Sequence, residues 1–273
     1  MKVAVAGGTG VAGRYAVEAL WDAGHEPVVL ARSTGVDLVS GTGLDEGLDA
    51  VSAVIDASNI GAQRATVVSE FFEASSRNLM RAAARGGVSH IVALSIVGID
   101  RVPYGYYQGK LRQEEVLRES PVPVSILRAT QFHEFPGQYL EWSSRRLVVV
   151  PKWRAQPVAA REVGALLARL AVGAPVPMTE LAGPKEERMA DLLRQVLAAR
   201  GERRRVLEIR VPGTTGRAMA TGDGLPGPGV ILSSQTFSDW LRSQPTSTPP
   251  APAPPASTPP APAPPASPAS GAR

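Results

Sequence analysis

The sequence of 273 residues contains no cysteine, which excludes disulfide bonds, thiolate metal sites and cysteine nucleophiles. The only histidines are His25, His90 and His133, and their wide separation predicts no metal site. No apolar run approaches the roughly 20 residues of a membrane-spanning helix. The apolar start of the chain is broken by glycines, unlike a signal peptide. These absences together predict a cytoplasmic protein that contacts no membrane.

Lysine is scarce as well, with four residues against 25 arginines. A lysine at a given position is therefore more informative than an arginine. The net charge is +4, but charges of both signs are mixed along the chain, and the only basic run is Arg203–Arg205. This pattern is typical of a solvated surface, so we expect no direct contact with nucleic acid.

The C-terminal segment differs sharply in composition from the rest of the chain. The decapeptide STPPAPAPPA occurs at 247–256 and again at 257–266, and from Gln244 onward the only charged residue is Arg273. Such a segment has too little apolar surface to offset the entropy lost on ordering. We expect 244–273 to be a disordered tail that samples polyproline II. A PxxP docking role is the alternative, but no basic residue flanks the motif.

The first 130 residues alternate short apolar runs with amphipathic ones. Strands are predicted at 2–6, 27–31, 52–58, 90–95 and 123–129, and helices at 11–24, 66–85 and 107–119. Buried strands that alternate with helices indicate a parallel sheet covered on both faces. The fold class is therefore α/β, with a doubly wound, Rossmann-type parallel sheet at 1–130.

The pattern loosens after residue 130. Amphipathic helices are predicted at 162–173 and 189–201, and a strand at 205–213. We expect 131–243 to form a smaller substrate-side region that packs on the sheet.

The first predicted strand runs directly into a glycine-rich loop that opens a helix. The loop fits G-x-G-x-x-G, and with its first glycine also G-x-x-G-x-x-G. Its glycines allow a sharp turn, close approach of a pyrophosphate and tight packing of the helix on the strand. Backbone amides and the helix dipole would face the phosphates. The candidate cofactor-binding residues here are Gly7, Gly8, Thr9, Gly10, Val11, Ala12 and Gly13, with Arg14 adding positive charge.

In a dinucleotide-binding fold, the residues at the end of the second strand contact the 2′ position of the adenosine ribose. An NAD site usually has a carboxylate there, whereas this chain has Arg32 and Ser33. A guanidinium can grip a 2′-phosphate with two hydrogen bonds. This favours NADP(H), although NAD(H) is possible because Arg32 could simply be an exposed arginine.

Tyr106 and Lys110 are spaced to share one face of a helix. A free phenol has a pKa of about 10. An ammonium about 4 Å away favours phenolate by about 4 kcal/mol at an effective dielectric constant of about 20. We therefore expect Lys110 to lower the pKa of Tyr106, which could then act as a general acid or base. Ser95 would orient a substrate oxygen. A surface pair of no catalytic role is the alternative.

The segments GGTGVAGR (7–14), ARS (31–33), ALSIVGID (93–100), YYQGKLRQEE (106–115) and ILRATQFHEF (126–135) resemble the short-chain dehydrogenase/reductase superfamily. The similarity is greatest to its atypical, NmrA-like branch. It implies NAD(P) at the glycine loop and a catalytic set of Ser95, Tyr106 and Lys110, with Lys110 also bonding the ribose. The resemblance also implies that the segment after residue 130 closes over the substrate. Two further groups of cofactor contacts are implied, Ala57, Ser58 and Asn59 beside the adenosine half, and Ala129, Thr130, Gln131 and Phe132 beside the nicotinamide.

These residues predict an NADP(H)-dependent oxidoreductase that acts on a carbonyl or quinone-like small molecule. The main alternative is a non-catalytic NADP(H) sensor that signals through a partner such as a transcription factor, since some NmrA-like members bind the cofactor without turnover. An epimerase or dehydratase with tightly held NAD is a third hypothesis, against which Arg32 argues. No pattern in the sequence specifies the substrate, the direction of reaction or the oligomeric state.

Overall fold

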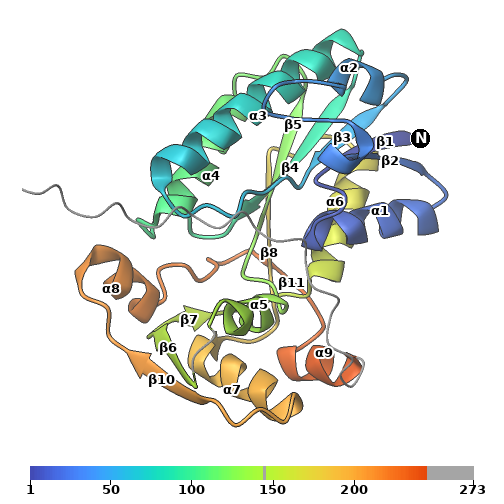
Figure 1. Cartoon of the computed structure of the whole chain (residues 1–273). Coiled ribbons are helices and arrows are strands. Elements are labelled where there is room, and N and C mark those ends of the chain that lie inside the picture. Colours follow the sequence, from blue (N-terminus) through green and yellow to red (C-terminus); the bar gives the residue numbers. More distant parts are fainter. Residues whose placement is uncertain (144–145, 245–273) are drawn as a thin grey trace, which may run out of the picture.

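The computed structural model describes residues 1–143 and 146–244, so the predicted tail at 244–273, apart from Gln244, lies outside the described residues (Figure 1). The described chain contains a seven-stranded sheet in which every paired strand is parallel. In spatial order its strands are β11 (Ile231–Leu232), β8 (Met178–Ala182), β5 (Val124–Ala129), β4 (His90–Ile96), β3 (Ala53–Asp56), β1 (Lys2–Ala6) and β2 (Glu26–Leu30). The predicted α/β, Rossmann-type fold is confirmed.

The order of the strands reverses beside β1. The chain passes from β1 to β2 on one side and then to β3 on the other, so that Ala6 pairs with both Leu30 and Asp56. β1 and β3 are apolar except for Lys2 and Asp56, and every residue in them except Lys2 is buried, as expected for a parallel sheet covered on both faces. This reversal creates the switch point at which doubly wound folds bind ligands.

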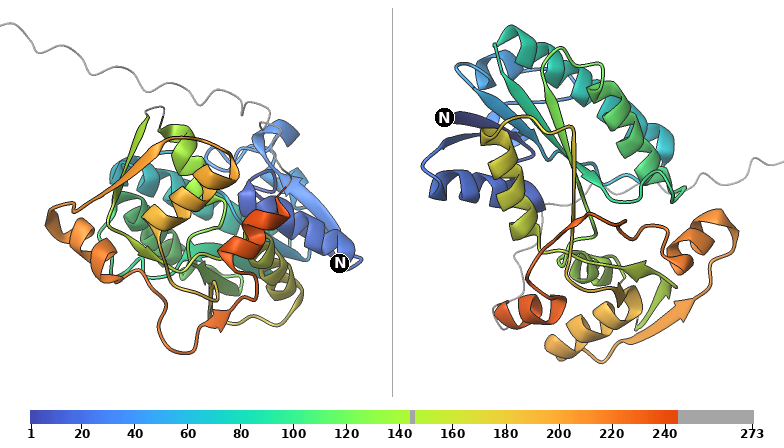
Figure 2. Two further views of the ribbon diagram at one scale, coloured as in Figure 1. Left: turned by 90° about the horizontal axis from the view of Figure 1, so that it is seen from below. Right: turned by 180° about the vertical axis from the view of Figure 1, so that it is seen from behind.

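Helices cover both faces of the sheet (Figure 2). One face carries α1 (Val11–Asp22) and α6 (Ala160–Val172), and the other carries α3 (Ala65–Arg85) and α4 (Gly105–Leu117), with α2 (Leu44–Gly47) near its edge. Glycine allows the helices on each face to touch. A Cβ on Gly164 would lie 2.6 Å from the Ala16 amide nitrogen, and one on Gly109 would lie 2.3 Å from Val68 Cγ1.

A smaller region lies beyond the carboxyl ends of the strands of the main sheet (Figure 1). Its elements are α5 (Phe135–Trp142), β6 (Leu147–Pro151), β7 (Arg154–Ala155), β9 (Glu187–Arg188), α7 (Met189–Ala199), β10 (Arg205–Ile209), α8 (Gly213–Thr221) and α9 (Phe237–Ser243). β6 pairs with β10 in parallel, and β7 pairs with β9 antiparallel. Buried residues of α5, β6, α7 and α9 form a separate core for this region.

The smaller region does not contain the whole of 131–243. The chain leaves the sheet after β5, and then α6, β8 and β11 return to it. The predicted helices at 162–173 and 189–201 correspond to α6 and α7. The strand predicted at 205–213 ends at Ile209, because Pro212 and Gly213 begin the unpredicted helix α8.

His133 ties the smaller region to the strand ends. Its Nε2 lies 2.9 Å from the Pro157 carbonyl oxygen, and its ring packs against Phe237 and Trp240. Burial lowers the pKa of His133 to about 4, partly opposed by the Pro157 carbonyl and the charge of Glu162. The imidazole is therefore neutral in the folded protein near pH 7.

The buried histidine predicts a loss of stability in acid. Its folded pKa of about 4 lies below the unfolded value of 6.5, so its contribution is present above pH 6.5 and is lost as the pH falls through 4. At roughly 1.4 kcal/mol per pKa unit, the loss is roughly 3 kcal/mol. Urea unfolding at pH 4 and at pH 6.5 gives the free energy of unfolding of the wild type and of His133→Gln, whose side chain does not titrate. Between these two pH values, the wild type should lose more stability than the variant. Parallel losses in the two proteins would contradict this account.

Candidate functional site

The candidate residues gather because the carboxyl ends of β1, β2, β3, β4 and β5 share one edge of the sheet. This edge faces the smaller region, into which the chain continues after β5 (Figure 1). In open α/β sheets, the crevice outside these strand ends is the usual ligand site.

The glycine loop connects β1 to α1 and can be formed only without side chains at two positions. Gly7 has a φ of +72°, and a Cβ there would lie 2.7 Å from the Ala57 carbonyl oxygen. A Cβ on Gly13 would lie 2.2 Å from the carbonyl oxygen of Gly7. The loop therefore packs against its own helix and against the segment after β3, and its glycines have no side chains to cover the backbone. The amides of Gly7, Gly8 and Gly10 donate to protein carbonyls, which leaves the amides of Thr9 and of the first turn of α1 for a phosphate.

The N-terminus of α1 is suited to an anion. Gly10 is its N-cap residue, and no side chain in the described structure caps the helix there. The first amides of a helix have no partner within the helix, and the helix dipole places positive charge at this end. The exposed Arg14 lies one turn further on, with its guanidinium 4.8 Å from the centre of the Tyr15 ring. The loop fits the pyrophosphate of a dinucleotide.

Arg32 and Ser33 follow β2 in a short 3₁₀ turn, Arg32–Thr34. Because β2 pairs with β1, the turn begins beside the glycine loop, where the Gly7 amide donates to the Leu30 carbonyl. The turn is braced by Thr34, whose Oγ1 accepts from the Ala31 amide. Arg32 is exposed and has no ion-pair partner among residues 1–143 and 146–244. Its guanidinium is accessible to a phosphate.

Two of the predicted cofactor contacts carry buried polar atoms that lack partners. Within the described part of the chain, neither Ser58 Oγ nor Gln131 Oε1 has a hydrogen-bond partner. Ser58 adjoins Gly7 in the loop after β3, and Gln131 follows β5. Buried polar atoms are normally satisfied, so these two fit groups that would hydrogen-bond a ligand.

The other predicted contacts after β3 and β5 have partners in the protein. Thr130 Oγ1 donates to the Gln156 carbonyl, and Phe132 forms a bridge with Val158. The Ala57 amide donates to the Ala6 carbonyl, and Ala129 ends β5. These contacts fix the two loops relative to the sheet.

Tyr106 lies in the first turn of α4 and is half-buried. Its hydroxyl donates to Asn59 Oδ1 over 2.6 Å. Burial raises the pKa of Tyr106, and the neighbouring phenols of Tyr107 and Tyr104 add to the effect. The predicted lowering of this pKa by Lys110 is therefore wrong, because desolvation of the phenolate dominates.

Lys110 lies one turn after Tyr106 on α4, is buried, and has protein partners of its own. Its Nζ donates to the Leu94 carbonyl over 2.9 Å and to Gln113 Oε1 over 2.8 Å, and lies 4.2 Å from the centre of the Phe72 ring. Burial lowers the pKa of Lys110 to about 8, against the opposing charges of Asp56 and Glu114.

The predicted role of Ser95 does not match its position. Ser95 is buried at the end of β4, and its hydroxyl donates to Glu114 Oε1 over 2.6 Å. Arg128 grips the same carboxylate with two hydrogen bonds of 2.9 and 2.8 Å. Leaving one of these buried charges unpaired would cost about 3–5 kcal/mol. Ser95 thus faces α4 as part of a buried ion-pair cluster.

An apolar cluster borders Tyr106 that the motifs did not reveal. Tyr107 is buried beside Tyr106, its ring packs edge-on against Tyr104, and its hydroxyl accepts from Gln131 Nε2 over 3.4 Å. Ile96 and, from α8, Ala218 and Met219 belong to the same cluster. In the sequence, the three tyrosines within 104–107 were the one feature that could have indicated this cluster. The cluster lies where the smaller region meets the strand ends.

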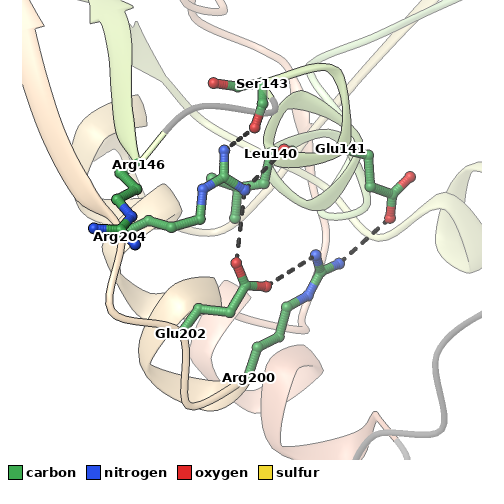
Figure 3. A pocket seen from close by; sticks show the side chains of 7 residues that line it. All are labelled: Leu140, Glu141, Ser143, Arg146, Arg200, Glu202 and Arg204. Carbon is green, nitrogen blue, oxygen red and sulfur yellow. Dashed lines mark hydrogen bonds and ion pairs between the residues drawn. The ribbon is translucent and has the colours of Figure 1, made fainter.

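A separate pocket of about 420 Å³ lies on the smaller region (Figure 3). It is lined by Leu140, Glu141, Ser143, Arg146, Arg200, Glu202 and Arg204. Arg200 pairs with Glu141 and Glu202, and Arg204 donates to the carbonyls of Leu140 and Ser143. None of these residues belongs to the strand ends, so this pocket is not the dinucleotide site.

Among residues 1–143 and 146–244, no group of three or more histidine, aspartate or glutamate residues is placed to hold a metal ion. Within the same ranges, no helix combines the length and the apolar character required to cross a membrane.

Solved structures with this fold include reductases and epimerases. The triphenylmethane reductase of Citrobacter sp., complexed with NADP(H), superposes with a TM-score of 0.67 at 17% identity, covering 89% of this chain and 99% of that one. The NADPH-dependent quinone oxidoreductase of Escherichia coli has a TM-score of 0.61 at 17% identity, covering 88% and 98%. The UDP-N-acetylglucosamine 4-epimerase of Bacillus cereus has a TM-score of 0.62 at 19% identity, covering 88% and 96%. Similarity at this level establishes the fold.

At the level of sequence, the photosystem II assembly factor Ycf39 of Synechocystis sp. is 30% identical over 155 residues, covering 51% of this chain and 48% of that protein. The chain therefore spans about half the length of the curated relative it matches. A family model described as NAD(P)H-binding matches residues 7–170, which include the glycine loop, β4, α4 and β5. This match covers more than half of the sequence, and the chain belongs to the NAD(P)H-binding family.

Proposed function

We propose that the protein is an NADP(H)-dependent oxidoreductase that reduces a carbonyl or quinone-like small molecule. One observation carries this proposal: the bare glycine loop and the half-buried Tyr106 lie at the same edge of the sheet, with Arg32 beside the loop. We further propose the cytoplasm as its location, because a chain without cysteine suits a reducing compartment.

The chain's own residues would hold the cofactor in an extended pose across the strand ends. Amides of the glycine loop would bind the pyrophosphate, and Arg32 would bind the 2′-phosphate through two charge-assisted hydrogen bonds. Ser58 and Gln131 have buried polar atoms available to the adenosine and nicotinamide halves respectively. When bound, the cofactor supplies the hydride.

Tyr106 would supply the proton. Its raised pKa keeps the phenol protonated near neutral pH, which is the form needed to donate to the oxygen of a substrate as negative charge develops there. The hydrogen bond to Asn59 would pass to that oxygen. Lys110 retains a third N–H beyond its bonds to Leu94 and Gln113, which we assign to the ribose or to the phenolate.

The surroundings of Tyr106 support a flat, apolar substrate. Tyr104, Tyr107, Ile96 and Met219 form an aromatic and aliphatic cluster around it. Aromatic side chains bind planar molecules well through offset or edge-on ring contacts. A quinone or an aromatic carbonyl compound combines such a surface with an oxygen that Tyr106 could protonate.

A second function, a non-catalytic NADP(H) sensor, is favoured by the arrangement of the catalytic candidates. The Ser95 hydroxyl donates to Glu114, and the Nζ of Lys110 bonds Leu94 and Gln113 instead of Tyr106. A sensor would bind both cofactor forms with different affinities and oxidise nothing. An NAD-dependent epimerase, as among the proteins of similar fold, would have to tolerate Arg32 beside the ribose.

The role assigned to Arg32 predicts the choice of cofactor. Arg32→Glu should weaken NADPH binding about 10–100-fold, because it replaces charge-assisted hydrogen bonds with repulsion, and should leave NADH the preferred cofactor. Fluorescence titration with both cofactors measures this. Arg81→Glu, on exposed helix surface, makes the same change of charge and should leave the preference unaltered. An unchanged preference in Arg32→Glu would remove Arg32 from the site.

The role assigned to Tyr106 predicts a loss of turnover without a loss of binding. Tyr106→Phe should lower kcat at least about 100-fold, the usual contribution of a general acid, while NADPH affinity stays nearly intact. Tyr139→Phe removes a hydroxyl in the smaller region that donates to the Val149 carbonyl, and serves as the control. Steady-state kinetics in which Tyr106→Phe turns over like the wild type would exclude this proton donor.

A further inference from the structure

Gln113 occupies an unusual position between two buried charges. It lies one turn after Lys110 on α4 and is 1% exposed. Its Oε1 accepts from Lys110 Nζ over 2.8 Å, and its Nε2 donates to Asp56 Oδ2 over 2.8 Å. Asp56 is itself fully buried at the end of β3. The side-chain amide therefore separates a buried ammonium from a buried carboxylate.

The side-chain amide can make both of these bonds, whereas a charged side chain cannot. An ammonium only donates and an ionised carboxylate only accepts, so the bridging group must present an acceptor on one side and a donor on the other. Glutamate in its ionised form has no donor, and arginine or lysine has no acceptor. The hydrogen-bond pattern also fixes the orientation of the amide, with its oxygen toward Lys110.

The remaining charged and polar groups around Lys110 have partners. Asp56 Oδ1 accepts from the Ser58 amide over 3.0 Å. From α4 itself, Glu114 is held by Ser95, Arg128 and Arg118. From the packed neighbours, β4 contributes the Leu94 carbonyl and α3 the Phe72 ring.

We propose that Gln113 is a positioning residue that holds Lys110 in place and keeps it from closing a direct ion pair with Asp56. Such a pair would draw the ammonium toward β3. With the amide between them, Lys110 is fixed by two directed bonds and keeps a third N–H, which the proposed function assigns to the ribose or the phenolate. The consequence for the reaction rests on the proposed function of Lys110, whereas the effect of Gln113 on Lys110 does not.

The small number of lysines makes this testable in the full-length chain. Lysine labelled with ¹³C at Cε gives signals only from Lys2, Lys110, Lys152 and Lys185. Single arginine substitutions at Lys2, Lys152 and Lys185 identify three of the signals, so that Lys110 is assigned without altering it. Its titration is then followed over the pH range in which the protein remains folded.

Two variants should move this titration in opposite directions. Gln113→Glu is nearly isosteric and adds an anion beside the ammonium, so the midpoint for Lys110 should rise by about one unit, a tenfold change. Gln113→Leu removes the acceptor but leaves a side chain of similar size between Lys110 and Asp56, so the direct ion pair stays blocked and the midpoint should fall. Gln108→Glu, at an exposed position of α4, adds the same charge outside the bridge and is the matched control. It should leave the midpoint within about 0.2 units of the wild type.

Identical titrations in the wild type and both Gln113 variants would overturn the proposal. Shifts in the same direction would also overturn it, because they would reflect a general disturbance of packing. If Gln113→Leu does not fold, Gln113→Glu measured against Gln108→Glu still decides the question.

The activity measurement separates this inference from the proposed function. In an active enzyme, the pH profile of kcat should move with the Lys110 midpoint in each variant, while KM for NADPH changes less. If the wild-type protein oxidises no NADPH and the two Gln113 variants still shift the Lys110 titration in opposite directions, the bridge is supported and the oxidoreductase is not. If the enzyme is active and a Gln113 variant shifts the Lys110 midpoint without shifting the pH profile of kcat, the link between Gln113 and the reaction is overturned.

Discussion

The shared direction of the strands is the constraint on which the candidate site depends. Because all strands of the main sheet run the same way, the loops that follow β1, β2, β3 and β5 meet at one edge, together with the end of β4. Gly7 and Gly13 then allow α1 to approach that edge so closely that its first amides are presented to the crevice. The smaller region packs beyond this edge, with α8 reaching the tyrosines of α4 (Figure 1).

Buried charges fix α4 relative to the sheet. Glu114 joins α4 to β4 and β5 through Ser95 and Arg128, and Gln113 joins it to β3 through Asp56. Charges removed from water must be paired or hydrogen-bonded, so each of these contacts restricts where the helix can lie. The position of Tyr106, at the start of the same helix, follows from these contacts as well as from apolar packing.

Local patterns predicted the features that depend on neighbouring residues. The glycine loop, the central strands and α4 follow from glycine spacing and from apolar runs, and the structure contains them. The return of β8 and β11 to the sheet depends on pairing with distant strands, and β11 has only two residues. The surroundings of Ser95 and Tyr106 depend on Glu114 and Asn59, whose directions no spacing rule specifies.

The central claim is that this NAD(P)H-binding protein transfers hydride to a small molecule. Its most direct test is to follow NADPH oxidation by absorbance with the full-length protein and a panel of quinones, aldehydes and ketones. We predict turnover of at least one flat aromatic quinone or carbonyl compound well above the rate without enzyme. Tight binding of NADPH with no oxidation by any member of the panel would contradict the claim and favour the sensor.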